Sequence, residues 1–238
     1  MSGMNARDLH PWQVTSHEAI AIQKRLRSQV MTHGTVGEVH YIAGADISTS
    51  KDSPKAYAGV VVLSYPQLEV VEERGLEDKV TFPYVPGLLA FREGPVLINV
   101  FEQLTTEPDV IVFDGQGLAH PRGMGIASHM GLVFDKPTIG CAKSLLYGRY
   151  QEPAQAKGAW AELRDPQGNV IGAVVRSKLK TSPIFVSVGH RIDLATAIGL
   201  LLECTRGVRI PEPTRLAHNF VTRLSRAHGR KGDQPRLL

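Results

Sequence analysis

The chain has 238 residues, of which 42% are hydrophobic, so it can bury one sizeable core and we expect one domain. It carries 27 Lys and Arg against 23 Asp and Glu, and this modest basic excess favours phosphate-bearing partners without requiring one. The polar N-terminus and the short apolar runs argue against a signal peptide and a membrane span, so we expect a cytoplasmic protein.

The first third of the chain predicts a helix followed by an antiparallel meander. Thr15 and Glu18 have capping-box spacing, and apolar residues then recur at helical spacing, which predicts a helix over about residues 15–32. Three segments rich in apolar and β-branched residues follow, joined by short links that favour hairpins. These predicted strands are residues 40–48, 56–65 and 68–75.

The rest of the chain alternates strands and helices, which predicts an α/β fold with a mixed sheet. A proline-rich loop leads to a helical segment at about 88–105, where Pro95 indicates either two helices or one kinked helix. The short apolar segment 109–114 is typical of a buried parallel strand. Further elements are expected as a helix ending near 134, strands at 137–142, 160–163, 170–175 and 184–190, a helix from Asp193 to Cys204, and a helix over 213–224.

Two features complete the predicted organisation. Cys141 and Cys204 stand in apolar segments without metal-site spacing, so we expect two reduced, buried thiols. Residues 1–224 are expected to form the domain, and the basic segment 225–238 is expected to be a disordered tail.

Three carboxylates occupy positions from which separate elements could bring them together. Asp46 interrupts an apolar strand, Asp114 ends a second strand, and Glu93 lies on a helix that would cross the sheet. Ligands bind at the carboxyl ends of strands in open α/β sheets, and converging carboxylates repel one another unless a cation such as Mg²⁺ or Mn²⁺ lies between them. Taken singly, Asp46 could instead cap a turn and Glu93 could lie on a solvated helix face.

Six motifs together resemble the endonuclease V family, which has a ribonuclease H-like fold. They span about residues 40–218 and read IAGADIS, FPYVPGLLAFREGP, VFDGQGLAHPRGMGIASHMGL, PTIGCAKSLLYG, VSVGHRIDL and RIPEPTRLAH. The resemblance implies a mixed β-sheet, with an antiparallel meander and parallel strands, flanked by helices.

The same resemblance implies a catalytic set. Asp46, Glu93 and Asp114 would bind Mg²⁺, with Mn²⁺ as an alternative, while Lys143 and His218 would lie beside the ion. His218 could bind the metal or orient water and transfer a proton, and Lys143 could contact phosphate. Read from the residues alone, both side chains could instead be solvated.

The resemblance also implies how a damaged base would be recognised. The PYVP loop, which comprises Pro83, Tyr84, Val85 and Pro86, would be a wedge whose ring replaces lost base stacking. A tyrosine packed under a rigid surface turn is the alternative. The backbones of two segments would line a pocket for the flipped hypoxanthine, and these residues are Gly87, Leu88, Leu89, Gly125 and Ile126. Simple turn geometry would also account for the glycines.

The sequence gives separate expectations for four polar residues in the loop and helix that follow Asp114. His120 and Arg122 are expected to approach the nucleic-acid backbone, because guanidinium suits phosphate. His129 is expected to be a core or supporting histidine. Gln116 stands where several relatives have histidine, and we expect it to make polar contacts with a neighbouring strand.

The implied activity is a nick at the second phosphodiester bond on the 3′ side of deoxyinosine in DNA, leaving 3′-hydroxyl and 5′-phosphate ends without base excision. One alternative is the same chemistry on inosine-containing RNA. Another is a non-catalytic nucleic-acid-binding protein with the same fold, although clustered acids would not help binding to phosphates. We expect a monomer that acts on nucleic acid and not at a membrane.

Overall fold

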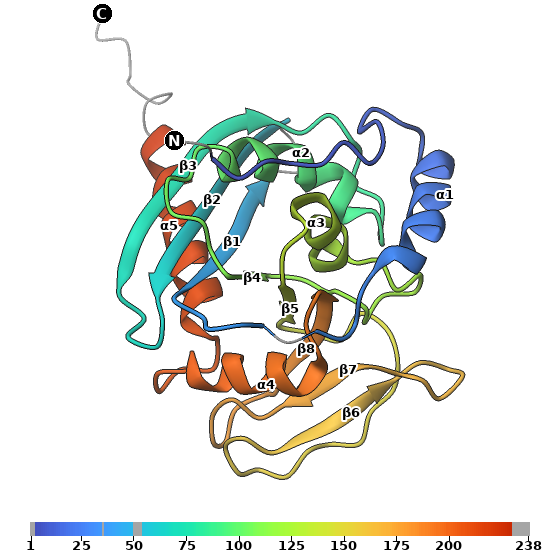
Figure 1. Cartoon of the computed structure of the whole chain (residues 1–238), viewed down its shortest axis with the longest axis vertical. Coiled ribbons are helices and arrows are strands. Elements are labelled where there is room, and N and C mark those ends of the chain that lie inside the picture. Colours follow the sequence, from blue (N-terminus) through green and yellow to red (C-terminus); the bar gives the residue numbers. More distant parts are fainter. Residues whose placement is uncertain (1–2, 35, 50–53, 230–238) are drawn as a thin grey trace, which may run out of the picture.

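A computed structural model describes residues 3–34, 36–49 and 54–229, in which helices cover both faces of an eight-stranded mixed sheet (Figure 1). The strands are β1 (Tyr41–Thr49), β2 (Lys55–Ser64), β3 (Val70–Lys79), β4 (Val110–Phe113), β5 (Thr138–Ala142), β6 (Trp160–Arg164), β7 (Val170–Val175) and β8 (Ile184–His190). The helices are α1 (Ser16–Leu26), α2 (Leu89–Phe101), α3 (Ile126–Phe134), α4 (Leu194–Glu203) and α5 (Glu212–Gly229).

The strand order across the sheet is β3-β2-β1-β4-β5-β8-β7-β6. Strands β1, β2 and β3 form the predicted antiparallel meander, and β1, β4 and β5 run parallel to one another. Strands β8, β7 and β6 continue the sheet in antiparallel pairs. The predicted fold class, a mixed sheet flanked by helices, is therefore confirmed.

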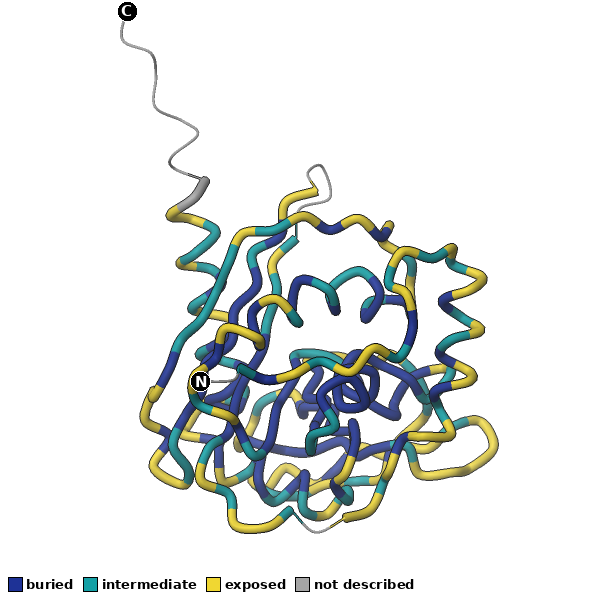
Figure 2. The backbone as a smooth tube through the Cα atoms, turned by 45° about the horizontal axis from the view of Figure 1, so that its top comes forward, coloured by how far each residue is buried: buried dark blue, intermediate teal, exposed yellow. Residues whose placement is uncertain are grey.

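Alternate residues of the central strands build two separate cores. In β4, Val110 and Val112 join the core beneath α4 and α5, whereas Ile111 and Phe113 join the core beneath α2 and α3. All four side chains are buried because successive residues of a strand point to opposite faces. Figure 2 shows these central strands enclosed by partly exposed helices and loops.

Helix α5 lies against β1 and β2, and its close approach depends on Gly44 of β1. A side-chain carbon at Gly44 would lie 1.9 Å from the carbonyl oxygen of Pro213, so only glycine permits this contact. Gly44 and Asp46 are two residues apart in β1, and their side-chain directions therefore share the face that α5 covers. This packing places the first turns of α5 above the carboxyl end of β1.

Several predicted boundaries differ from the structure. The first helix ends at Leu26 and is followed by a short 3₁₀ segment, Arg27–Gln29, while β3 is shifted toward the C-terminus. Pro95 lies inside a single helix. The disordered tail was wrong for residues 225–229, because α5 continues to Gly229 after Leu224 packs against Gly75 of β3. Residues 230–238 lie outside the described part of the chain.

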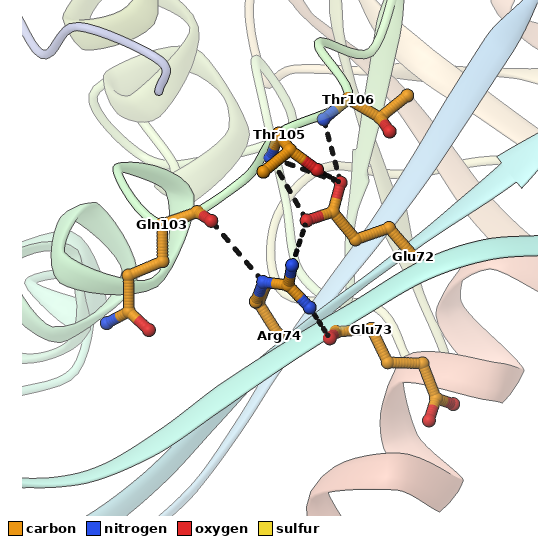
Figure 3. A network of polar contacts seen from close by, with 6 residues as sticks. All are labelled: Glu72, Glu73, Arg74, Gln103, Thr105 and Thr106. Atoms are coloured by element: carbon orange, nitrogen blue, oxygen red, sulfur yellow. Dashed lines mark hydrogen bonds and ion pairs between the residues drawn. The ribbon is translucent and has the colours of Figure 1, made fainter. Parts of the chain in front are cut away.

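A buried carboxylate ties β3 to the loop that precedes β4 (Figure 3). Glu72 accepts hydrogen bonds from the backbone N–H groups of Thr105 and Thr106, at 3.0 and 2.7 Å, and from the Thr105 hydroxyl at 3.0 Å. Arg74 approaches the same carboxylate at 3.0 Å. Burial by itself raises the pKa of Glu72, but these hydrogen bonds outweigh it and leave the pKa below its usual value.

We expect Glu72→Gln to lower the free energy of unfolding at neutral pH by about 1–3 kcal/mol, because the new amide N–H₂ would face backbone donors. Glu72 has a lowered pKa in the folded state, so its contribution is present above its unfolded pKa and is lost as pH falls through the folded pKa. Urea titrations at a series of pH values should therefore show that the difference in unfolding free energy between wild type and Glu72→Gln shrinks as the pH falls. Glu73→Gln is the control, since the Glu73–Arg223 pair is more exposed and should contribute at most about 1 kcal/mol. Equal losses in the two variants would contradict a special role for Glu72.

Three further predictions from the sequence concern the two cysteines, His129 and membrane-spanning segments. Cys141 and Cys204 are both free and buried, as predicted. His129 is buried in the core, where its Nε2 lies 2.6 Å from Nε2 of His10. Within the described residues, no helix has the length and apolar character needed to cross a membrane.

Candidate active site

Asp46, Asp114 and His218 converge at the carboxyl ends of β1 and β4. Each offers a ligand atom, and these atoms all lie within 4.8 Å of one another. Asp46 belongs to β1, Asp114 directly follows β4, and His218 lies on α5, so the packing of α5 through Gly44 completes the group. The Nδ1 atom of His218 lies 2.9 Å from Oδ2 of Asp46.

Glu93 approaches the same centre from α2, on the opposite face of the sheet. It is not a member of the close group of ligand atoms, but its burial and the charges of Asp46 and Asp114 raise its pKa to about 8. Burial also raises the pKa of Asp46, helped by the charge of Asp114, although a hydrogen bond from His218 opposes this. The carboxylates therefore lie in a region that disfavours their combined negative charge.

A divalent cation fits this donor set. Carboxylate oxygens are the hard ligands that Mg²⁺ and Mn²⁺ prefer, and the imidazole of His218 is a base beside them. Burial first, and then repulsion between the carboxylates, raises the pKa values of Asp46 and Glu93, and a cation among these groups would oppose both effects. The fit rests on the identity and mutual proximity of these groups.

Lys143 closes the centre on its other side. It directly follows β5, and its ammonium nitrogen lies 2.5 Å from Oδ2 of Asp114. The Lys143 side chain is 43% exposed, whereas that of Asp114 is 17% exposed, so the ammonium group remains accessible to an incoming anion. The predicted neighbours Asp114 and Lys143 are thus brought together.

A cavity of about 410 Å³ opens beside this centre. Gly87 and Leu89 line one wall, Gly125 and Ile126 line another, and Asp114 and Lys143 lie at the margin. Four of the five residues predicted for the base pocket border this one space, but Leu88 does not line it. Leu88 is buried in a core with Phe82 and Phe91, because the turn at Gly87 directs the side chain of Leu88 inward.

The loop between Phe82 and Leu88 presents Tyr84 to solvent. Tyr84 lies between Pro83 and Pro86 in the chain, and it is 72% exposed although tyrosine is on average a partly buried residue. Phe82 and Leu88 are buried on either side of it, and the N–H of Leu88 donates to the carbonyl of Val85 at 3.0 Å. The alternative of a tyrosine packed beneath the turn does not match this structure.

His120 and Arg122, which were predicted to approach the nucleic-acid backbone, both hold the tyrosine loop from within. The carbonyl oxygen of Gly87 accepts hydrogen bonds from Arg122 at 2.7 Å and from His120 Nε2 at 3.0 Å. Gln23 of α1 donates to the same oxygen at 3.0 Å and accepts from Arg122 Nε at 2.5 Å. Three side chains from two distant segments thus converge on one backbone carbonyl.

The protonation of His120 follows from these contacts. Its Nε2 must carry the proton to donate to the Gly87 carbonyl, and its Nδ1 then accepts from the backbone N–H of Arg122 at 3.1 Å. Burial, together with the charge of Arg122, lowers the pKa of His120 to about 4. His120 is therefore a neutral structural histidine near pH 7.

Sequence reasoning did not identify Gln23. A signal was present, because Gln23 is a polar residue on the buried face of α1, together with Ala19 and Leu26. Gln116, by contrast, makes the polar contacts that were expected of it. Its amide donates to the carbonyl of Ser144 at 3.2 Å and accepts from the Ser187 hydroxyl of β8 at 3.5 Å.

Comparisons with known proteins agree on one family. The sequence profile of the family described as Endonuclease V matches residues 24–219. The chain is 48% identical to an endonuclease V of Trichormus variabilis over 214 residues, which cover 90% of this chain and 96% of that protein. It is similar to the crystal structure of the Bacillus subtilis endonuclease V, with a TM-score of 0.90, 30% identity, and coverage of 96% of this chain and 100% of that one. It is also similar to the crystal structure of the Ciona intestinalis endonuclease V in complex with a 24mer DNA containing an inosine followed by a ribo-adenosine. The TM-score is 0.78 and the identity 28%, and the match covers 89% of this chain and 98% of that one.

Proposed function

The chain belongs to the endonuclease V family, with its ribonuclease H-like fold, and is an endonuclease; we propose that it recognises deoxyinosine in DNA and nicks the second phosphodiester bond on the 3′ side. The observation that carries this proposal is that one cavity is lined both by Asp114 of the carboxylate cluster and by Lys143, the ion-pair partner of Asp114. A base in the cavity would hold its own strand beside the acidic centre. The inosine-containing DNA bound to the Ciona intestinalis protein supports this choice of substrate.

Recognition begins with the exposed ring of Tyr84. When hypoxanthine leaves the duplex, the ring replaces the stacking that the neighbouring bases lose. The cavity volume of about 410 Å³ falls in the usual range for small-molecule sites, roughly 300–1,000 Å³. Backbone groups of Gly87 and Gly125 can approach the base edge closely, since neither residue carries a side chain.

Cleavage uses the groups around Asp46. Asp46, Glu93 and Asp114 would hold Mg²⁺, with Mn²⁺ as the alternative, and such an ion supplies positive charge beside the scissile phosphate and acidifies water. His218 donates from Nδ1 to Asp46, which leaves Nε2 to accept a proton from the attacking water. Lys143 stabilises the negative charge that develops on the phosphate oxygens.

The products follow from in-line attack at phosphorus. The oxygen of water joins the phosphorus, the bond from phosphorus to the 3′ oxygen breaks, and this oxygen takes a proton. The ends are therefore a 3′-hydroxyl and a 5′-phosphate, and the damaged base stays attached to its sugar.

The position of the nick on one inosine-containing duplex tests the proposal. With Mg²⁺ present, we expect wild-type protein to cut only the inosine strand, at the second phosphodiester bond on the 3′ side, with an undamaged duplex as the control. Matched DNA, RNA and hybrid strands should be compared, because contacts with the 2′-hydroxyl distinguish the sugars. Release of free hypoxanthine would contradict the proposed chemistry, and preferential cutting of the RNA strand would change the substrate to RNA.

A further inference from the structure

A second cavity, of about 600 Å³, lies beyond Lys143 and has no role in the steps above. Its lining includes Tyr150, Glu152, Arg176, Lys180 and Arg209. Lys143 is the residue that this cavity and the base cavity have in common. The ammonium group that contacts Asp114 therefore stands between the two spaces.

The sheet places the second cavity on the same edge as the carboxylate cluster. Strand β8 begins beside the end of β5, where Ala142 pairs with Phe185, and β7 ends beside the start of β8, where Val175 pairs with Ile184. Along this edge the side chains change from the acidic Asp46 and Asp114, through Lys143, to a basic group. The polynucleotide backbone would meet the acidic centre and the basic cavity in succession.

Lys180 and Arg209 supply the positive charge of this cavity. Arg176 is buried and paired with Glu152 at 2.5 Å, so its charge is compensated. In the described ranges, neither Lys180 nor Arg209 forms an ion pair with a carboxylate. Two positive charges in one recess are therefore available to an anion.

Arg209 is also held in a fixed position. Its guanidinium group donates to the carbonyl oxygen of Lys143 at 2.6 Å and to that of Pro183 at 2.8 Å. Its Nε atom is buried without a hydrogen-bond partner among the described residues. A buried donor without an acceptor is unfavourable, so the guanidinium group keeps unsatisfied hydrogen-bonding capacity.

We propose that this basic cavity binds a backbone phosphate of the damaged strand on the 3′ side of the nicked bond. The inference rests on the proposed function, which puts the lesion in the first cavity and the nick on its 3′ side. Because Lys143 separates the two cavities, a strand that runs from the lesion past the nick enters the basic cavity next. Lys180 and Arg209 then contact phosphate and not base, so the contact is independent of sequence.

The test compares Lys180→Gln with Lys178→Gln, since Lys178 is an exposed lysine on the same loop that does not line the cavity. Nicking is measured against KCl concentration on two inosine duplexes. In one, the damaged strand continues past the nick; in the other, it ends at the nucleoside directly after the scissile bond. On the long strand, Lys180→Gln should raise KM several-fold, leave kcat nearly unchanged and reduce the salt slope by about one.

On the short strand, wild type and Lys180→Gln should be alike, and Lys178→Gln should match wild type on both. Lys180→Arg should restore the salt slope, and thermal unfolding of each variant checks that the fold is kept. An unchanged KM on the long strand, or an equal loss on both strands, would overturn the proposed phosphate contact while wild-type nicking remains. Absence of inosine-directed nicking by wild type would instead overturn the proposed function on which the inference rests.

Discussion

Asp114→Asn is expected to lower the nicking rate on an inosine duplex by roughly 10³-fold, equivalent to about 4 kcal/mol of transition-state stabilisation. The substitution keeps the shape of the side chain but removes a charge that faces Asp46, His218 and Lys143. Two effects combine, because a divalent cation loses a carboxylate ligand and Lys143 loses its ion-pair partner. Single-turnover nicking with saturating Mg²⁺, followed by a Mn²⁺ series, measures the loss.

Asp109→Asn provides a matched control from the other end of β4. Asp109 accepts hydrogen bonds from the backbone N–H groups of His40 and Tyr41, at 2.8 and 2.9 Å, and an asparagine oxygen can accept them as well. We expect this variant to nick at nearly the wild-type rate. Wild-type activity in Asp114→Asn would remove the carboxylate cluster from the reaction, and an equal loss in both variants would point to a general effect of the strand.

Tyr84→Ala is expected to reduce kcat/KM on an inosine duplex by roughly 10- to 100-fold, because stacking on an aromatic ring contributes about 1–3 kcal/mol per base. The ring is 72% exposed, so its removal should leave the melting temperature almost unchanged. Tyr84→Phe retains the ring and should retain most of the activity. Inosine in a single strand should be affected less, because no partner strand has to be separated.

The comparison between duplex and single strand decides the role of Tyr84. Stopped-flow fluorescence of an analogue base next to the inosine should show slower unstacking with Tyr84→Ala than with Tyr84→Phe. Tyr84→Ala could instead weaken binding to undamaged DNA and nicking of the inosine duplex and single strand by the same factor. That result would argue against a wedge. It would indicate that the ring acts only by general contact with nucleic acid.

The tyrosine loop and the acidic centre are linked by the architecture around Gly87. Gln23, His120 and Arg122 all donate to its carbonyl, and the cavity that Gly87 lines is also lined by Tyr84 and Asp114. The loop is therefore held by neutral and charged donors from α1 and from the segment after β4. A rigid loop loses less conformational entropy when it contacts a substrate.

The sequence by itself determined the elements whose signals are local. The apolar run of β4 predicted a buried parallel strand, and the capping box of Thr15 and Glu18 predicted the start of α1. The motif resemblance identified Asp46 and Asp114 as neighbours. The alternation of side chains along β1 is consistent with the position of Asp46 on the face of the sheet that α5 covers. Such signals can be read from the sequence because side-chain direction in a strand or helix follows from spacing along the chain.

Only the tertiary structure decided which hydrogen-bond partners the polar side chains have. Gln23 and Gly87 are 64 residues apart, and no periodicity predicts that they share a hydrogen bond. His120 and Arg122 were expected to approach the nucleic-acid backbone, and the structure shows that both donate to the carbonyl of Gly87 inside the protein. Leu88 packs in the core and not at the cavity. The physical reason is that a polar group bonds to whatever acceptor the packing brings within about 3 Å, and packing depends on all the contacting elements at once.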